Sequence, residues 1–204
     1  NLGVEQGLPA SKVYAALEDA DGRIWLGTEA GLARYDGLVV ETFGPEKGEA
    51  DNGVRSLFRD GKGRIWAGHL GGGITCFDGR RATAVRLHGA DLDTDITGIA
   101  EDGEGHLWLT TFGQGAFRFA VGDDGTTGAV ERFSSEHGVD ERLVGLVPLR
   151  DGSLCFLGAA GRVFRAVDGG FEPMVFPGVP DLHRVTALYE EASGGLWVGT
   201  YTGG

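Results

Sequence analysis

The chain repeats one short pattern five times along its length. Each copy is an apolar run with an aromatic residue near its centre, followed by a glycine-containing turn. The copies are GRIWLGTEAGL at Trp25, GRIWAGHLGGG at Trp66, GHLWLTTFGQG at Trp108, GSLCFLGAAG at Phe156 and GGLWVGTYTGG at Trp197. The aromatic residue therefore recurs after 41, 42, 48 and 41 residues. Such a period is typical of stacked supersecondary units, in which each unit buries its faces only against its neighbours.

Further short runs surround the aromatic run in a constant order. The first run of each repeat ends in acid, as in VYAALED (13–19) and ITGIAED (96–102). Two more runs follow the aromatic run, for example LARYD and VVETF in the first repeat. Runs of about five to seven residues, rich in β-branched and aromatic types and separated by Gly and Asp, are strands. Because no stretch keeps the apolar spacing of a helix, the sequence predicts an all-β protein.

The burial pattern of the runs predicts how they are layered. Ile24, Trp25 and Leu26 are consecutive apolar residues, which indicates a strand buried on both faces, whereas VVETF (39–43) alternates as an outer strand does. Four antiparallel strands in each repeat match one blade of a β-propeller. A β-sandwich also has short strands, but it would not return the same tryptophan-glycine pattern in each unit. The polar segment VGDDGTTGAV (121–130) explains the long interval as a lengthened surface hairpin.

The repeats set the expected boundaries of the blades. We expect an incomplete arc over residues 1–204, made of four blades and half of a fifth: about 13–43, 54–87, 96–133, 143–176 and 185–204. The chain starts at Asn1, and its only methionine is Met174. We therefore expect a part of a larger propeller, with the remaining blades of that propeller as its partners. An open arc would otherwise leave unpaired sheet edges.

The repeat unit resembles the two-component-regulator propeller repeat. The resemblance rests on V-x-x-x-x-E-D-x-D-G-x-I-W-x-G-T-x-x-G-L-x-R-Y-D and on the lead-in EQGLPASKV at 5–13. The fourth copy departs from it, with Phe156 in place of tryptophan. The resemblance implies an extracytoplasmic, for example periplasmic, sensor region of a bacterial hybrid histidine kinase or diguanylate cyclase. It also implies a small-molecule or oligosaccharide ligand and a possible homodimer of the full-length protein.

Composition and charge exclude several other classes. The formal net charge of −12 argues against nucleic acid as a partner, because a phosphate backbone requires a basic patch. The sequence contains no apolar run of about 18 residues, so we expect no direct membrane insertion of this segment. Cys76 and Cys155 lie too far apart for a C-x-x-C metal site, and each is expected to be a small buried residue.

The motifs of catalysis and metal binding are weak here. DADG (19–22) is read as a hairpin turn, because Arg23 and Ala30 occupy places where an EF-hand needs oxygen ligands. The aromatic residues of the repeats are expected to pack blade against blade. The five histidines follow no metal-ligand spacing, and no nucleophile elbow, P-loop or dinucleotide fingerprint occurs. We therefore expect no cofactor, no metal and no catalytic residue.

Ligand recognition is expected where the loops of one face converge. If the acid-ended strand is innermost, the loops before it and the loops after the W-x-G-T strand open on the same face, and they vary from copy to copy. Exposed aromatics would stack on a sugar, and polar groups would bind its hydroxyls. The candidate ligand-binding residues are Lys12, Glu29, His69, Phe112, Gln114, His183 and Tyr201.

Three functions compete at this stage. The first is a non-enzymatic ligand-sensing propeller. The second is a propeller lyase resembling streptogramin lyases, which would need a general base such as His69 or His183 at the channel mouth. The third is a non-catalytic protein-interaction scaffold. Turnover that depends on a divalent cation would favour the lyase, whereas stabilisation by a ligand without turnover would favour the sensor.

Overall fold

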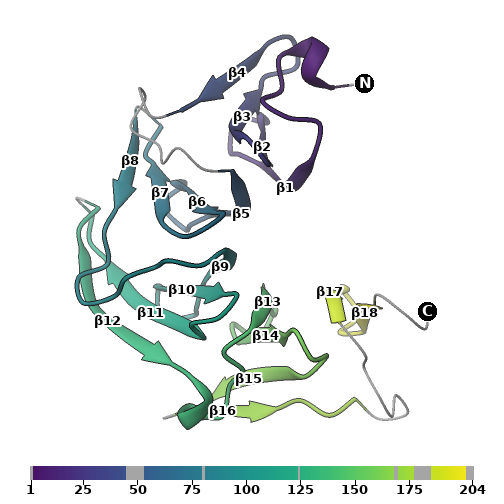
Figure 1. The fold of residues 1–204 in the computed structure, drawn as a ribbon. Helices are drawn as coiled ribbons and strands as arrows, with labels where there is room; N and C mark the ends of the chain where they lie inside the picture. Colours follow the sequence, from purple (N-terminus) through teal and green to yellow (C-terminus); the bar gives the residue numbers. More distant parts are fainter. Residues whose placement is uncertain are drawn as a thin grey trace.

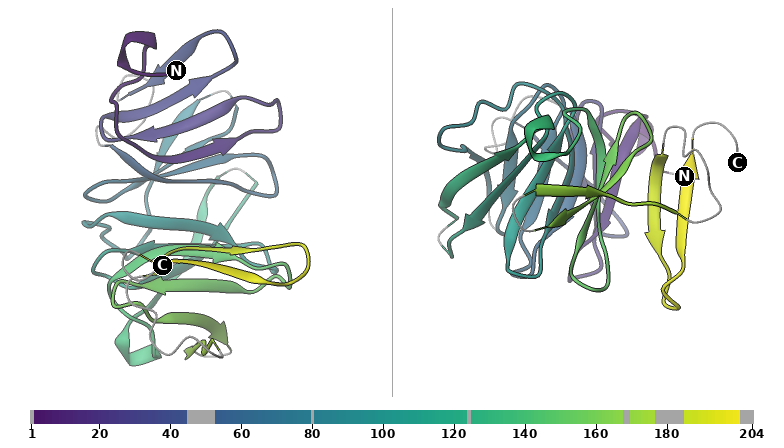
Figure 2. Two further views of the ribbon diagram at one scale, coloured as in Figure 1. Left: turned by 90° about the vertical axis from the view of Figure 1, so that its right-hand side faces the viewer. Right: turned by 90° about the horizontal axis from the view of Figure 1, so that it is seen from below.

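The chain forms an open arc of stacked β-sheets. The computed structural model describes residues 2–44, 53–79, 81–123, 125–167, 170–176 and 185–200. The sheets lie side by side around a common centre, and the two ends of the arc are separate (Figure 1). Seen from the side, the strands of successive sheets are layered face to face (Figure 2). The prediction of an all-β propeller arc is confirmed.

Four sheets have four strands each and the fifth has two, in the described part of the chain. The strands are, in order, β1 (Val13–Glu18), β2 (Ile24–Thr28), β3 (Gly31–Tyr35) and β4 (Val40–Phe43); β5 (Val54–Arg59), β6 (Ile65–His69), β7 (Ile74–Phe77) and β8 (Ala82–Val85); β9 (Ile96–Glu101), β10 (His106–Thr111), β11 (Ala116–Val121) and β12 (Thr127–Phe133); β13 (Leu143–Pro148), β14 (Leu154–Gly158), β15 (Val163–Val167) and β16 (Gly170–Pro173); and β17 (Val185–Glu190) with β18 (Leu196–Thr200). Among the residues described, the 3₁₀ turns η1 (Val4–Gln6) and η3 (Ser135–His137) precede blades 1 and 4.

Each blade is an antiparallel meander whose first strand faces the centre of the arc. The innermost strands β1, β5, β9, β13 and β17 pack in sequence against one another, and β4, β8, β12 and β16 form the outer rim (Figure 1). The outer strand of blade 4, β16, covers Gly170–Pro173 and so ends before residue 176, the expected end of that blade. Val167 pairs with Gly170 at one end of the ladder between β15 and β16.

An aspartate fixes the buried tryptophan in each of the first three blades. In blade 2 the Asp60 carboxylate accepts hydrogen bonds from the amides of Lys62 and Arg64, from Arg64 Nε at 2.6 Å and from Trp66 Nε1 at 2.9 Å. The turn, the strand and the indole are thus held by one side chain. We call this arrangement the aspartate–tryptophan pair.

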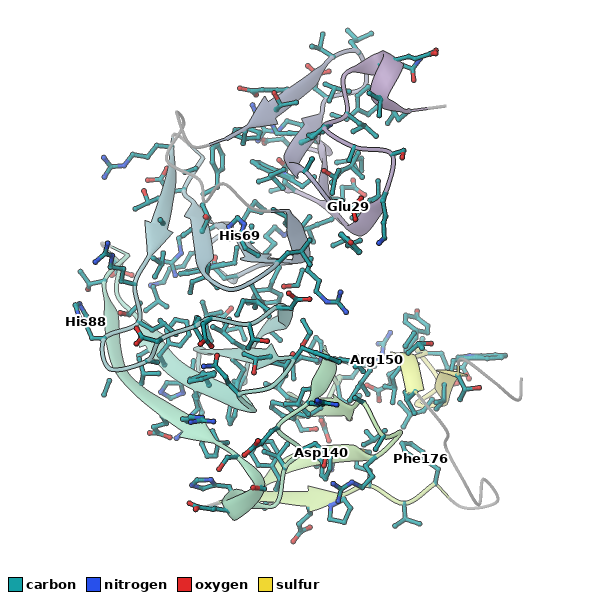
Figure 3. The ribbon with its side chains drawn as sticks, in the orientation of Figure 1. Glu29, His69, His88, Asp140, Arg150 and Phe176 are labelled. Atoms are coloured by element: carbon teal, nitrogen blue, oxygen red, sulfur yellow. The ribbon has the colours of Figure 1, made fainter. Side chains whose placement is uncertain are left out.

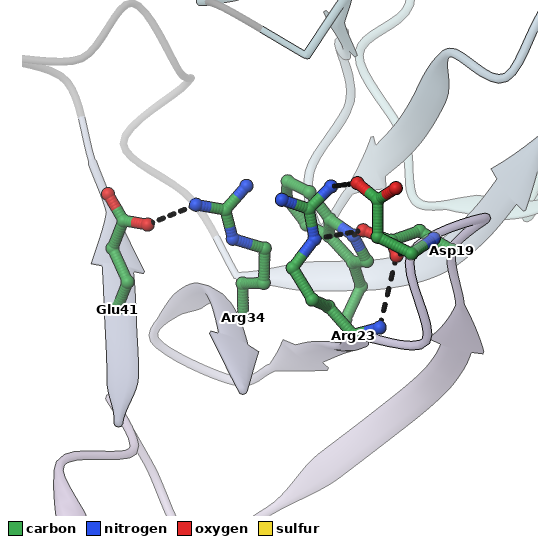
Figure 4. A network of polar contacts seen from close by, with 6 residues as sticks. Asp19, Arg23, Arg34 and Glu41 are labelled. Atoms are coloured by element: carbon green, nitrogen blue, oxygen red, sulfur yellow. Dashed lines mark hydrogen bonds and ion pairs between the residues drawn. The ribbon is translucent and has the colours of Figure 1, made fainter. Parts of the chain in front are cut away.

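The same pair recurs in blades 1 and 3. Asp19 accepts from Trp25 Nε1 at 2.9 Å, and Asp102 accepts from Trp108 Nε1 at 2.8 Å. Figure 4 shows Asp19 joined to Arg23, with the ion pair of Arg34 and Glu41 beside it. The predicted hairpin turn at 19–22 is confirmed, and Asp19 accepts the amides of Asp21 and Arg23 there; its bond to the indole was not foreseen.

The pairs bring the indoles into the spaces between blades. Trp25 packs against Phe43 and against Phe77 of blade 2, with ring centroids 5.2 and 4.8 Å apart. Trp66 and Trp108 lie in the next two interfaces. Trp197, on the two-stranded sheet, is 67% exposed. Burial between blades is therefore confirmed for the first three tryptophans, and Trp197 departs from it.

Blade 4 contains neither member of the pair. Cys155 pairs with Val147 in the register in which Trp25 pairs with Leu17, so Cys155, and not Phe156, takes the tryptophan position. Leu149 takes the aspartate position, because its amide bonds to Ser153 O as the amide of Asp19 bonds to Arg23 O. The assignment of Phe156 to this position was wrong. Phe156 lies on the opposite face, 5.2 Å from the Trp108 ring.

Both free cysteines are buried, as expected. Cys155 packs with Leu149, Leu157 and Val185 between blade 4 and the fifth sheet. Burial raises the pKa of the Cys76 and Cys155 thiols to about 11. Both thiols therefore stay protonated at neutral pH and act as small apolar side chains.

Removing the charge of Asp60 should destabilise the arc. Burial by itself would raise the pKa of Asp60, but the hydrogen bonds from Trp66 and Arg64 outweigh it and hold the pKa below its usual value. We expect Asp60→Asn to lower the free energy of unfolding by about 1–3 kcal/mol in urea titrations at neutral pH. The exposed Glu104→Gln serves as control, with a change within about 0.5 kcal/mol.

The loss of stability caused by Asp60→Asn should be largest at neutral pH and smaller in acid. A carboxyl whose pKa is lowered by folding contributes its full stability above the unfolded value of about 3.9 and loses it as the pH falls. The difference between wild type and Asp60→Asn should therefore shrink as the pH falls below about 4. A difference that stays constant down to the acid transition would contradict the role of the ionised Asp60.

A second prediction concerns His106, which stands where Arg23 and Arg64 stand in blades 1 and 2. His106 Nδ1 is buried without a hydrogen-bond partner and lies 3.5 Å from Asp102 Oδ1. We expect His106→Arg to supply the missing bond to Asp102 and to raise the free energy of unfolding by about 0.5–1.5 kcal/mol. Unchanged or lower stability would show that an arginine at position 106 does not bond Asp102 as Arg23 bonds Asp19 and Arg64 bonds Asp60.

Candidate functional site

A β-bulge interrupts every innermost strand at the same position. The pairing register shifts between Val13 and Ala15 in blade 1 and between Val54 and Ser56 in blade 2, and likewise in the three sheets that follow. One residue of each strand is thereby left outside the ladder, and such bulges redirect side chains. The five bulged residues are Tyr14, Arg55, Thr97, Val144 and Thr186.

All five bulged residues line one cavity on the inner side of the arc. This central cavity has a volume of about 320 Å³ and is otherwise formed by the innermost strands and Leu157. In its wall a small residue follows each bulged one, for example Ala15, Ser56 and Gly98, and larger apolar residues such as Leu57 and Ile99 come next. The framework of the wall is thus repeated, while the bulged side chain changes from blade to blade. That combination is how repeat proteins build a specific site on a constant scaffold.

An aromatic and charged cluster lies at the mouth of the cavity on blades 1 and 2. Lys12 Nζ lies 4.8 Å from the centre of the Tyr14 ring, and the Arg55 guanidinium lies 5.9 Å from it. Glu29 approaches Lys12 at 3.6 Å and Tyr14 Oη at 3.5 Å. Tyr14 first and Glu29 second raise the pKa of Lys12, so its ammonium stays charged at neutral pH.

Arg55 is held from the neighbouring blade. Its Nη1 lies 3.7 Å from Asp95 Oδ2, and Asp95 Oδ1 also accepts the Gly71 amide at 2.8 Å. Asp95 thus joins the loop of blade 2 to the first strand of blade 3. A guanidinium anchored in this way loses little conformational freedom when a ligand binds it.

A second aromatic–guanidinium contact lies on the same face at blades 3 and 4. Phe112 is 43% exposed, and the Arg142 guanidinium lies 5.8 Å from its ring centre. The two residues also form a backbone bridge that ties the loop of blade 3 to the entry of blade 4. Gln114 is committed to this loop, because its Nε2 donates to Asp91 O at 2.9 Å while its Oε1 is buried without a partner.

The structure places the candidate ligand-binding residues in different environments. Lys12, Glu29 and Phe112 are exposed on the loop face, and Glu29 lies on the inner side of the arc (Figure 3). The expectation of an exposed loop position was wrong for His69: it is the last residue of β6, is 0% exposed and bonds Thr75 Oγ1 at 2.8 Å. His183 and Tyr201 lie outside the described residues. Their binding role stays a prediction.

Sequence reasoning missed the bulged residues and Arg142. A signal was present: the first residue of each acid-ended strand is Val, Ile or Leu, whereas the second is Tyr, Arg, Thr, Val or Thr. Variation at one place in an otherwise constant repeat indicates a position freed from the packing of the fold.

Among the described residues, no group of three or more His, Cys, Asp and Glu side chains is arranged to hold a metal ion. His88 lies on the outer side of the arc, away from the cavity (Figure 3). Within the same ranges, no helix is long and apolar enough to cross a membrane. Aromatic rings, guanidinium groups and a carboxylate together suit a polar ligand with hydroxyl groups.

The cavity wall should not tolerate a larger residue at Gly98. A Cβ at this position would lie 2.7 Å from Thr110 Oγ1 and 2.8 Å from Leu146 N of the next blade. We expect Gly98→Ala to lower the free energy of unfolding by about 1–3 kcal/mol. Gly44→Ala is the control, because a Cβ there meets nothing within 4 Å; it should change the free energy of unfolding little in the same measurements. Equal effects of both substitutions would contradict close contact between the innermost strands.

The comparisons with known proteins agree with the repeat. The family model described as Two component regulator propeller matches residues 7–30, 48–71, 91–113 and 178–202. The sequence has no match among curated proteins.

Solved structures share the fold at low identity. BT3049 from B. thetaiotaomicron, described as the extracellular domain of a hybrid two-component system, superposes with a TM-score of 0.77 at 20% identity over 98% of this chain and 29% of its own. Virginiamycin B lyase from Staphylococcus aureus superposes with a TM-score of 0.72 at 16% identity, over 92% of this chain and 62% of the lyase. PorZ, a surface component of the type-IX secretion system of Porphyromonas gingivalis, has a TM-score of 0.72 at 15% identity, over 98% of this chain and 33% of PorZ. The chain therefore spans less than two thirds of each of these structures.

Proposed function

Because the chain is built from the repeats of the two-component-regulator propeller family, we propose that it is part of the extracytoplasmic ligand-sensing propeller of a bacterial signal-transduction receptor. The proposal includes that the arc itself is not an enzyme. Its ligand class is polar and rich in hydroxyl groups, as an oligosaccharide is.

One observation carries the proposal: the bulged residue of each blade lines one central cavity, and the residue type at that position varies between blades. A sensor needs a site that spans several blades, because a ligand shifts a conformational equilibrium only through contacts that differ between the two states. A ligand that bridges Tyr14 and Thr186 would contact both ends of the described arc. Its binding would favour one spacing of the blades.

The residues at the mouth suit a sugar. The Tyr14 and Phe112 rings offer apolar faces of the kind on which pyranose rings stack, and Glu29 and Arg55 offer an acceptor and donors for hydroxyl groups. Lys12, Arg55 and Arg142 further favour a sugar that bears a carboxylate.

The lyase remains the second candidate, supported by the fold shared with virginiamycin B lyase. That reaction would need a general base close to the bound ligand. None of the histidines in the described residues lines the central cavity, and His69 is buried inside blade 2.

Thermal shift with oligosaccharides tests the sensor. We expect one member of a panel of neutral and uronic-acid-containing oligosaccharides to raise the melting temperature by about 5–10 °C at about 100 times its Kd, since this occupancy stabilises by about 2.7 kcal/mol. Arg55→Ala and Tyr14→Ala should weaken binding about tenfold or more. Arg59→Ala, at the opposite end of the same strand, is the matched control and should bind as wild type.

Two results would overturn the proposal. Binding that is equal in wild type, Tyr14→Ala and Arg55→Ala would remove the central cavity as the site. Chemical conversion of the bound compound, followed by mass spectrometry over the same incubation, would favour the lyase.

A further inference from the structure

The central cavity has one charged side chain in its lining among the residues that the structure describes, the Arg55 guanidinium. The other side chains of the lining are apolar or carry a hydroxyl group, and no carboxylate is among them. A guanidinium keeps its charge at every pH at which proteins are folded. Arg55 therefore sets the charge that a ligand meets inside the cavity.

The aliphatic hydroxyl groups of the lining are already used by the fold. Ser56 Oγ donates to Ile96 O at 2.9 Å, and Thr97 Oγ1 donates to Leu143 O at 2.9 Å, so that each bond joins two neighbouring blades. The Thr186 hydroxyl likewise donates to a carbonyl of the fifth sheet, at 3.2 Å. Each hydroxyl group has a single proton to donate. A ligand inside the cavity therefore gains no hydrogen-bond donor from these three groups.

The N–H donors of Arg55 remain available. Its closest acidic oxygen is Asp95 Oδ2 at 3.7 Å, which is longer than a hydrogen bond, and its other contact is the face of the Tyr14 ring at 5.9 Å. Within the described residues, its guanidinium donates no hydrogen bond. In the aspartate–tryptophan pairs, by contrast, Arg23 and Arg64 bond their aspartates at 2.8 and 2.6 Å. Arg55 is thus oriented by its neighbours without being saturated by them.

Asp95 is fixed by bonds that do not involve Arg55. Its Oδ1 accepts the Gly71 amide at 2.8 Å, and its carbonyl oxygen accepts the Phe112 amide at 3.0 Å. These bonds hold Asp95 between the loops of blades 2 and 3. Because the side chains of Arg55 and Asp95 are 31% and 32% exposed, water screens their attraction, and such a pair is weak. An anion that comes closer to the guanidinium than 3.7 Å can replace it.

A carboxylate is the group that matches these properties. Its two oxygens accept parallel N–H bonds from the fork of a guanidinium, and such charged bonds are about twice as strong as neutral ones. A neutral hydroxyl group would exchange one water bond for another of similar strength and gain little. The remaining wall, which includes Leu57, Ile99 and Leu146, offers apolar contact to the body of the ligand.

We propose that the central cavity selects a ligand that carries a carboxylate, which binds Arg55, and that Asp95 competes with this carboxylate for the guanidinium. The inference rests on the proposed sensor function and narrows its ligand class from polar sugars in general to acidic ones. The acidic group lies in the cavity, and the hydroxyl groups of the ligand lie at the mouth. Asp95 sharpens the selection, because an uncharged ligand does not displace it.

Benzoate and benzamide are the probes, because they have the same shape and differ in charge. The readout is the Arg55 Nε–H resonance of labelled protein. We expect benzoate to shift this resonance saturably, with a Kd of about 1–10 mM, and benzamide to bind at least about tenfold more weakly. In variants of Arg55, the ring resonances of Tyr14 report binding instead. Arg55→Gln should abolish the preference for benzoate, and Arg55→Lys should retain part of it, because the charge stays and the fork is lost.

Asp95→Asn tests the competition. An asparagine keeps an oxygen for the Gly71 amide and removes the negative charge beside Arg55. We expect it to tighten benzoate binding about two- to fivefold and to leave benzamide binding unchanged. Asp91→Asn removes the same charge at an exposed position of the same loop and is the matched control, which should change neither affinity. A loss of structure at Asp95 would not tighten binding.

The outcomes separate this proposal from the sensor proposal. Equal binding of benzoate and benzamide would overturn the carboxylate site, and so would the absence of a saturable shift with benzoate at about 50 mM. Weaker binding of benzoate to Asp95→Asn would overturn the competing role of Asp95. A neutral oligosaccharide that binds wild type and Arg55→Gln equally would reject the carboxylate and leave the sensor standing. Preference for benzoate without binding of any oligosaccharide would reject the sugar and leave the anion site.

Discussion

The bond from an aspartate to a buried tryptophan indole organises the first three blades. An indole is the largest apolar group that can fill the space between two sheets, but its N–H cannot be buried without an acceptor. Asp19, Asp60 and Asp102 supply that acceptor and use their remaining lone pairs on the amides of the adjoining turn. Turn geometry, strand register and packing between blades therefore depend on one side chain in each repeat.

The repeat made most of the fold predictable, and its failures have a physical cause. A period of 41–48 residues predicted the strands and the arc, because four strands and three turns need that length. Aligning the fourth repeat on its aromatic residue placed Phe156 one position out of register. Register is set by backbone pairing, and Cys155 with Leu149 preserves the pairing while replacing both side chains. Because Leu149 and Cys155 replace the aspartate and the tryptophan together, an alignment on aromatic residues cannot detect the replacement.

The face that we propose for binding could be predicted only in part. Loop positions follow from the strand order, so the exposure of Lys12, Glu29 and Phe112 was predictable. Tyr14 and Arg55 were missed because they lie inside strands, and only a bulge, a feature of the backbone, turns them into the cavity. His69 was misjudged for the opposite reason: it takes the place of Thr28 and Thr111 at the end of its strand, where the side chain is enclosed.

The apolar replacement in blade 4 divides the arc into parts that respond to different stresses. Blades 1 to 3 are joined around ionised carboxylates, whereas the core between blade 4 and the fifth sheet consists of Leu149, Cys155, Leu157, Val163, Val185 and Leu188. Attraction between apolar surfaces weakens on cooling, and ionised hydrogen bonds weaken in acid. Acid would therefore weaken blades 1 to 3 through their aspartates, whereas the described core at the fifth sheet contains no carboxylate on which acid could act. One chain with a single repeated outline thus joins blades whose stability depends on pH to a seam whose stability does not.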